Sequence, residues 1–333
     1  MAWNVFRFCT GLRIVGSIMI VVVLVIVAVS YYAVVIASYL PQLLAPGASF
    51  HDVILALLVL LLFHALLFML LWCYFSVVLT DPGSVPQAWS PAVDEDLEAE
   101  AVPLASTVQP GMGINLPASL VHSLPHNSQV RFCKKCNHFK PPRCHHCSVC
   151  GRCILKMDHH CVWVVNCVGA RNYKYFLLFL VRFLSGLELI AISFSYSISF
   201  YTFLETTLVT LALLPHFIAF FADVEEDSGS PGKLAATFLG FVLNLAFALS
   251  VIGFLIMHAS LVAGNSTTIE AYEKKVSAKW KYDLGRKRNF EQVFGARRSY
   301  WLIPSYAEED MRRLPALHGL DFPCKPDVGG DEL

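Results

Sequence analysis

Residues 133–167, CKKCNHFKPPRCHHCSVCGRCILKMDHHCVWVVNC, decide how this chain folds and which chemistry it can perform. Eight of the 11 cysteines fall in this stretch, and five histidines are interleaved with them. Cysteine mixed with histidine at such density is typical of zinc binding in a reducing compartment. The stretch therefore predicts bound metal and not a disulfide framework.

The stretch contains an internal repeat of 14 residues. One set reads C-x2-C-x9-H-x6-C and consists of Cys133, Cys136, His146 and Cys153; the shifted set is Cys147, Cys150, His160 and Cys167. Three thiolates and one imidazole complete a tetrahedral structural zinc site and leave no coordination position for an activated water. We expect two structural zinc ions that supply folding free energy to a segment too small to build its own core, and we disfavour a zinc hydrolase.

The same repeat shows which residues the metals leave unused. Cys161 stands at a first-ligand position of a third copy, but the second position holds Val164. A free thiol close to His159 and Asp158, between two zinc ligands, is a candidate nucleophile because a nearby imidazole lowers the pKa of a thiol. Asp158 would orient His159 and stabilise its charged form. The alternative is that Cys161 is a spare thiol in a zinc scaffold.

The rest of the chain is apolar, with 56% hydrophobic and 15% charged residues, which indicates a membrane protein. The runs 14–40, 53–79 and 234–262 are each long enough to cross a bilayer as a helix. Region 175–222 holds 48 mostly apolar residues, which would form a helix of about 72 Å against a hydrocarbon core of about 30 Å. We count it as one span with an excess, so that four transmembrane helices result.

Basic residues indicate the orientation of these spans. Two precede the first span, nine lie within 131–174 and twelve follow residue 262, whereas the connector 41–52 has none. By the positive-inside rule both termini and the cysteine-rich block face the cytosol, in a protein of the endomembrane system. Formal net charge is zero, which gives no reason to expect a nucleic-acid partner.

With Asp158-His159-His160-Cys161 inside this repeat, the chain resembles the DHHC family of protein S-acyltransferases (palmitoyltransferases), and in particular its plant members. The match continues through Trp163, Asn166, Cys167, Gly169, Asn172 and Phe176, through Asp81-Pro82-Gly83, through Thr267-Thr268-Ile269-Glu270, and through 289–295. The resemblance implies an all-α polytopic membrane protein with four transmembrane helices and a cytosolic loop-rich domain that holds two structural zinc sites.

Five parts of the chain follow from this interpretation. They are 1–80, the cytosolic N-terminus and helices 1 and 2; 81–130, the DPG motif and a flexible linker; 131–176, the zinc domain; 177–262, helices 3 and 4; and 263–333, a cytosolic tail with the TTxE-like and Asn289 elements. Deleting 181–200 would leave an ordinary span, so we predict an insertion there. Phe290, Val293 and Phe294 recur at helical spacing and predict a tail helix that docks on the membrane or the zinc domain.

The resemblance also implies a reaction in two steps. Cys161 takes a long-chain acyl group from acyl-CoA, such as palmitoyl-CoA, and a cysteine of a target protein then takes it from Cys161. Cys161 is thereby the nucleophile, His159 the base and Asp158 its orienting partner. The acyl tail would lie between the spans, where each buried CH2 gains about 0.8 kcal/mol. Membrane lipid and proteins with membrane-proximal cysteines are the implied partners.

Contacts to the acyl-CoA are predicted with alternatives. Trp163 and Phe176 are candidate walls beside the thioester, or interfacial aromatics that anchor a helix. Lys140 and Arg143 are the first candidates for the CoA phosphates, or members of a lipid-facing basic patch. The rival function is a catalytically inactive, membrane-anchored zinc scaffold that recruits proteins, and such a scaffold needs no Asp158.

Overall fold

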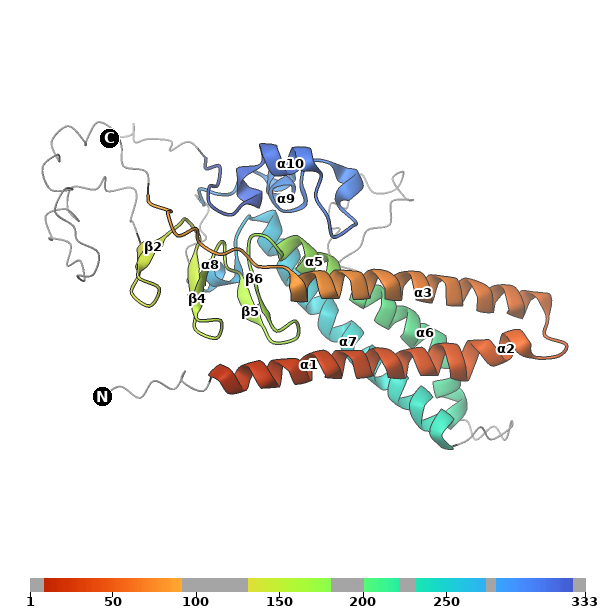
Figure 1. The fold of residues 1–333 in the computed structure, drawn as a ribbon. Coiled ribbons are helices and arrows are strands. Elements are labelled where there is room, and N and C mark those ends of the chain that lie inside the picture. The colour runs from red at the N-terminus through yellow and green to blue at the C-terminus, as the bar shows by residue number, and fades with distance from the viewer. Residues whose placement is uncertain (1–8, 92–130, 181–200, 222–230, 274–279, 326–333) are drawn as a thin grey trace, which may run out of the picture.

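The computed structural model describes residues 9–91, 131–180, 201–221, 231–273 and 280–325 of the chain. Within these ranges four helices are long and apolar enough to cross a membrane, namely Ile18–Leu44, Phe50–Leu79, Tyr201–Phe221 and Pro231–Ala263. The four expected transmembrane helices are thus confirmed. Figure 1 shows them running in one bundle, with the strands and the C-terminal helices gathered at one end.

The first two spans form an antiparallel pair. α1 (Cys9–Tyr31) continues through a π-helical stretch (Tyr32–Tyr39) into α2 (Leu40–Leu44), and α3 is Phe50–Leu79. α3 begins at Ser49, whose hydroxyl oxygen accepts the Asp52 backbone N–H at 3.2 Å and so caps the helix. The short connector that the cap closes is the base-free segment that the sequence places on the far side of the membrane.

The second pair of spans runs at an angle to the first pair (Figure 1). α5 (Tyr173–Leu180) leads out of the cysteine-rich block, and α6 (Tyr201–Phe221) and α7 (Pro231–Ala263) are the long helices that follow. α6 lies along α7, and Phe217 stacks on Phe241 with ring centroids 4.1 Å apart. The predicted insertion at 181–200 lies outside the described residues.

The cysteine-rich block is a row of three short antiparallel hairpins. β1 (Arg131–Cys133) pairs with β2 (His138–Lys140), β3 (His145–Cys147) with β4 (Arg152–Ile154), and β5 (His159–Cys161) with β6 (Asn166–Val168). Cys133, Cys147 and Cys161 occupy equivalent places, opposite His138, Arg152 and Asn166. The 14-residue repeat in the sequence is therefore a repeat of one hairpin, and Cys161 belongs to its third copy.

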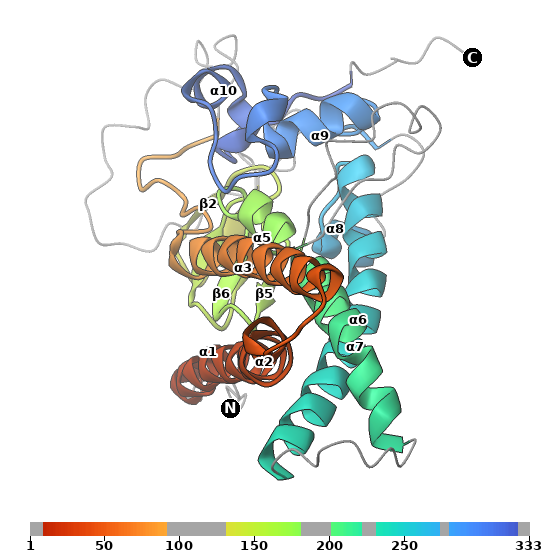
Figure 2. The same cartoon turned by 90° about the vertical axis from the view of Figure 1, so that its right-hand side faces the viewer.

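The C-terminal tail covers the same end of the bundle (Figure 2). It contains α8 (Thr268–Tyr272), α9 (Arg286–Phe294), α10 (Glu308–Arg313) and two 3-10 turns, Arg298–Tyr300 and Pro315–Leu317. The predicted tail helix is confirmed as α9. Its Val293 and Phe294 are buried in a core cluster together with Val164 and Val168 of the third hairpin and Leu177 of α5. The tail thus packs the third hairpin against the membrane helices.

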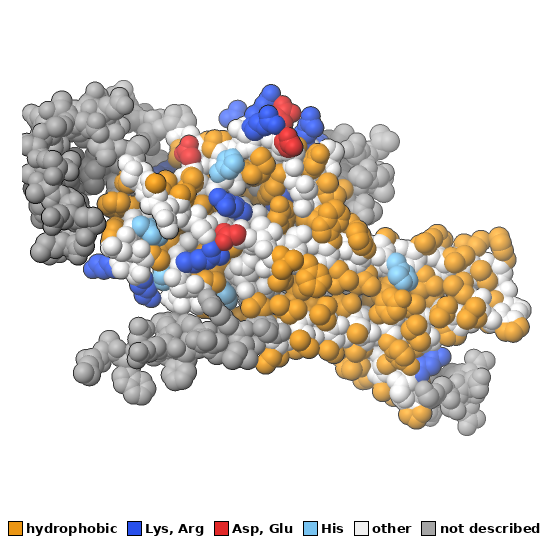
Figure 3. Space-filling model, viewed as in Figure 1, with side chains coloured by type: hydrophobic (Ala, Val, Ile, Leu, Met, Phe, Trp, Pro, Cys, Tyr) orange, Lys and Arg blue, Asp and Glu red, His pale blue; other side chains and the backbone are white. Residues whose placement is uncertain are grey.

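Charge is distributed as a membrane protein requires. Figure 3 shows an apolar surface along α1 to α3, while Lys, Arg, Asp and Glu side chains gather over the hairpins and the tail. Lys174 is one of several buried charged residues, and it lies at the start of α5, where its ammonium donates to the carbonyl oxygens of Phe294 and Ser305. This contact joins α5 to the tail.

Candidate active site and metal clusters

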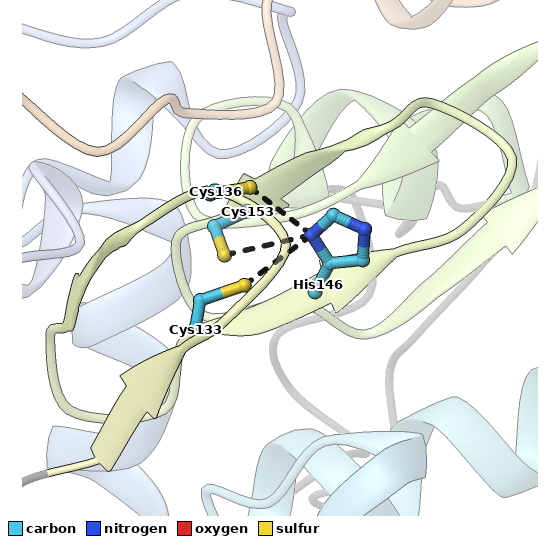
Figure 4. Close-up of side chains that lie close together, drawn as sticks. All are labelled: Cys133, Cys136, His146 and Cys153. Carbon is cyan, nitrogen blue, oxygen red and sulfur yellow. Dashed lines mark hydrogen bonds between the residues drawn. The ribbon is translucent and has the colours of Figure 1, made fainter. Parts of the chain in front are cut away.

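The first predicted ligand set is assembled between the first two hairpins. Sγ of Cys133, Cys136 and Cys153 lie 3.6, 3.2 and 3.8 Å from Nδ1 of His146 (Figure 4). Tetrahedral coordination, with Zn–S of about 2.3 Å and Zn–N of about 2.0–2.1 Å, places sulfur and nitrogen about 3.6 Å apart. The spacing of these four side chains therefore fits a metal ion.

The second set is assembled in the same way between the second and third hairpins. Sγ of Cys147, Cys150 and Cys167 lie 3.8, 3.4 and 3.5 Å from Nδ1 of His160. In each of the two sets, all ligand atoms lie within 4.8 Å of one another. Because each set takes two ligands from one hairpin and two from the next, two ions would fix all three hairpins in a row.

Cys161 is a member of neither cluster. The third hairpin that carries it is tied to the end of α3, since Asn166 donates from Nδ2 to the carbonyl oxygens of Val77 and Thr80 at 3.0 and 2.9 Å. The Tyr74 hydroxyl donates to the Trp163 carbonyl at 3.0 Å and makes a second connection to α3. The thiol is therefore held where the cysteine-rich block meets the transmembrane bundle.

Asp158, His159 and Cys161 form one series, in which Asp158 and His159 are hydrogen-bonded and Cys161 lies beside His159. Nδ1 of His159 lies 2.7 Å from Oδ2 of Asp158, which is 1% exposed. A carboxylate at this distance fixes the proton on Nδ1 and leaves Nε2 of His159 for the thiol. The thiol of Cys161 lies close enough to His159 for each group to shift the pKa of the other. The arrangement is that of a nucleophile, a base and an orienting acid.

The electrostatics of this series favour a thiolate and an imidazolium. Burial lowers the pKa of His159, but the hydrogen bonds to Asp158 and Cys161 outweigh it and raise that pKa to about 9. Burial raises the pKa of Cys161, but its hydrogen bond to His159 and the positive charge there bring that pKa below the ordinary value of a thiol. A nucleophilic thiol requires a lowered pKa of this kind.

Asp158 is held in turn by the segment after the last span. Thr268 donates its backbone N–H to Oδ1 at 2.9 Å and its hydroxyl to Oδ2 at 2.8 Å. Thr267 caps α8 and forms a capping box with Glu270, so the same motif also begins this helix. The contact from Thr268 to the site could not be foreseen, since the two residues are 110 positions apart.

A cavity of about 360 Å³ opens from the thiol into the bundle. Trp163 and Phe176, the two aromatic residues predicted as walls, line it together with Cys161. The ring of Phe176 lies 5.1 Å from that of His159, centroid to centroid, and Trp163 packs on Phe247 at 5.9 Å. All four spans contribute to the lining, most of the lining side chains are apolar, and the cavity suits an apolar ligand.

The structure corrects the expectation for Arg143. This side chain is 3% exposed, and its guanidinium donates to both carboxylate oxygens of Glu270 at 2.8 and 2.7 Å and to the Asn265 side chain at 2.9 Å. A guanidinium committed inside the protein is not available to CoA phosphates. Lys140 lies partly exposed on β2, and its contact with CoA stays a prediction.

His258 is a site residue that the sequence did not indicate, because it stands in the middle of an apolar run. It is fully buried on α7, its Nδ1 lies 3.2 Å from the Tyr173 hydroxyl, and it lies within 4.8 Å of Asp158 and His159 by ligand atoms. Its Nε2 has no hydrogen-bond partner among the described residues. The spacing of residues along α7 does not predict that His258 lies next to Asp158 and His159.

Comparison with known proteins agrees with this site. The DHHC palmitoyltransferase family model matches residues 126–275. The chain is 63% identical to Probable protein S-acyltransferase 14 of Arabidopsis thaliana over 98% of its length and 96% of the relative's, and 56% identical to Probable protein S-acyltransferase 13 over 100% and 99%. It is 34% identical to Palmitoyltransferase ZDHHC15 of Homo sapiens over 88% of this chain and 79% of that one. The chain belongs to the DHHC palmitoyltransferase family.

Proposed function

We propose that this protein is a protein S-acyltransferase that moves a long-chain acyl group from acyl-CoA to Cys161 and then to cysteine thiols of target proteins. One observation carries the proposal: Cys161 stands outside both metal clusters, has its pKa lowered by the neighbouring His159, and lines a cavity within the membrane bundle. The activity printed in the names of the related proteins supports the same chemistry.

The first step forms the acyl-enzyme. His159 takes the thiol proton on Nε2, and the thiolate of Cys161 attacks the carbonyl carbon of the acyl-CoA thioester. Asp158 stabilises the imidazolium that results. The C–S bond to CoA breaks, and the CoA sulfur leaves with the proton from His159. In the second step the thiol of the target protein repeats this attack on the Cys161 thioester.

Zinc bound in the two clusters would supply structure, because all four ligands of each set are protein groups. The protein itself contributes by holding Cys161 in place. The second cluster takes His160 and Cys167 on either side of Cys161, so the hairpin that carries the nucleophile is held along both strands. A target cysteine must reach this hairpin at the membrane edge, and we infer that substrates carry membrane-proximal cysteines.

The acyl tail is assigned to the cavity, where burial of apolar surface supplies affinity. The hairpins and the tail, which hold most of the described Lys and Arg residues, lie together at one end of the bundle (Figure 1), and the positive-inside rule assigns that end to the cytosol. Protease protection of an N-terminal tag in sealed microsomes tests this orientation, because a cytosolic tag is digested.

Labelling with alkynyl palmitoyl-CoA tests the function. The wild-type protein should acquire a hydroxylamine-labile label, and Cys161→Ser should abolish it. Cys324→Ser is the matched control, since Cys324 is an exposed thiol far along the chain in the tail, and its loss should leave the label unchanged.

Metal content of the same samples separates catalysis from folding. We expect two zinc ions per chain in wild type and in Cys161→Ser, and one in Cys136→Ser. A Cys161→Ser protein that keeps its label, or one that loses a metal ion, contradicts the proposal and leaves the anchored scaffold as the function.

A further inference from the structure

Glu205 is a carboxyl group buried within the membrane bundle, with no hydrogen-bond partner in the described part of the chain. It lies on α6, is 5% exposed, and lines the cavity that begins at Cys161. Neither of its carboxylate oxygens has a hydrogen-bond partner among the described residues. Ionisable side chains inside a membrane are costly, so those that occur usually mark a binding site or a pathway.

Other polar side chains line the cavity near the same depth. Asn244 of α7 donates from Nδ2 to the Ser30 hydroxyl of α1 at 2.8 Å, and both residues line the cavity, as does Thr206. The hydroxyl of Thr206 donates to the backbone of its own helix at 2.7 Å. Thr202 and Ser250 also line the cavity, and the other lining side chains are apolar.

Asn244 and Ser30 mark the end of the cavity that is remote from the thiol. Phe254 faces His159, with ring centroids 6.3 Å apart, and Asn244 precedes it on the same helix by ten residues. Ten helical residues span about 15 Å. One lipid acyl chain spans half of a hydrocarbon core of about 30 Å, which is also about 15 Å. A long acyl chain bound at Cys161 therefore brings its terminal carbons to the level of Asn244.

We propose that Glu205, together with Asn244 and Ser30 in the wall of the same cavity, forms a polar subsite that recognises a hydroxyl group at the far end of the acyl chain. The inference rests on the proposed function and names its donor class as long-chain acyl-CoA with a terminal hydroxyl. A methyl terminus leaves the Glu205 carboxyl buried without a partner, whereas a hydroxyl can both donate to it and accept from neighbouring donors. The subsite therefore favours the hydroxylated chain.

Three donors and three proteins test the subsite. The donors are octanoyl-CoA, too short to reach Glu205, palmitoyl-CoA, and ω-hydroxypalmitoyl-CoA. The proteins are full-length wild type, Glu205→Leu and Glu205→Gln in liposomes, and the readout is kcat/KM for acylation of Cys161. Zinc content serves as the folding control, and octanoyl transfer measures how each variant affects a chain that ends before the level of Asn244.

We expect the ratio of ω-hydroxypalmitoyl to palmitoyl transfer to fall about tenfold in Glu205→Leu and to be largely retained in Glu205→Gln, which keeps a hydrogen-bonding group. Zinc content should be equal in all three proteins. An unchanged ratio in Glu205→Leu overturns the subsite while leaving the transferase intact. Failure of wild type to load any of the three donors overturns the proposed function, and the subsite with it.

Discussion

The Thr268 hydroxyl donates to Oδ2 of Asp158 at 2.8 Å, and the Thr268 backbone N–H donates to Oδ1 at 2.9 Å. Oδ2 also accepts a hydrogen bond from the Nδ1–H of His159. The segment that follows the last membrane helix thus orients the Asp158 carboxylate. The carboxylate in turn orients the imidazole of His159. The TTxE-like motif contributes to the active site by this route and by its capping of α8.

Replacing Thr268 should slow acylation of Cys161 without removing the fold. Thr268→Val deletes the hydroxyl but keeps the backbone N–H contact, so we expect a loss of about ten- to hundredfold in kcat, as removal of one hydrogen bond to a buried charge implies. Single-turnover labelling from palmitoyl-CoA measures it. Thr268→Ser restores the hydroxyl and should recover most of the rate; equal rates in both variants would show that the hydroxyl is not required.

Asp158→Asn should move the pH dependence of Cys161 reactivity upward. Asp158 raises the pKa of His159, and the imidazolium in turn lowers the pKa of Cys161. Without the carboxylate charge the imidazolium is less populated, so the thiol pKa rises and the ascending limb of the profile shifts to higher pH. The rate of Cys161 alkylation by iodoacetamide against pH measures the shift.

The Asp158→Asn experiment has an internal reference in the exposed thiol Cys324, whose alkylation profile should not change. A Cys161 limb that stays in place in Asp158→Asn would mean that His159 does not depend on Asp158 for its charge. In that case the series described above has a structural role only.

Arg143 and Glu270 should behave as a structural ion pair and not as a CoA site. Their side chains are 1% and 5% exposed, and removal of one partner from a buried pair costs about 3–5 kcal/mol because the other charge is left uncompensated. Arg143→Ala should lower the melting temperature strongly, whereas Arg152→Ala, which breaks the half-exposed pair with Asp81, should cost about 1 kcal/mol or less.

The double variant Arg143→Met with Glu270→Leu completes this comparison. It removes both charges, so its melting temperature should lie above that of Arg143→Ala. If Arg143→Ala instead keeps the melting temperature and raises KM for palmitoyl-CoA, the guanidinium contacts CoA after all, and the burial described here does not represent the working enzyme.

How far the sequence predicts this protein depends on how local each feature is. The two metal sets and the free Cys161 follow from a repeat of one hairpin within 35 residues, so spacing alone identifies them. Arg143 was misassigned because its partner Glu270 is 127 positions away, and a basic residue near the site looks the same whether or not it is paired. His258 and Glu205 lie in apolar runs. Such runs do not show which side of the helix faces the site, and only the packing of the helices does.

The start of the third span leads to the final prediction. The Thr202 hydroxyl donates to the Phe179 carbonyl at 2.7 Å, although 23 positions separate them. Within α6, Thr206 donates in the same manner to carbonyls three and four positions before it. If 181–200 are removed, Thr202 stands three positions after Phe179. α5 and α6 therefore meet at this contact like consecutive turns of one helix, which supports the predicted insertion.

Deletion of 181–200 should accordingly preserve the site, because it joins two helical ends that already lie one turn apart. We expect the variant that lacks 181–200 to keep two zinc ions per chain and to load Cys161 at least as fast as the full chain. Its melting temperature should be higher because the connection between α5 and α6 is shorter. A deletion of the same length that begins at Tyr201 is the control, and it should abolish loading since it removes α6 and Glu205 from the cavity wall. Loss of zinc or of Cys161 labelling after deletion of 181–200 would show that these residues are required for the third span and are not an insertion into it.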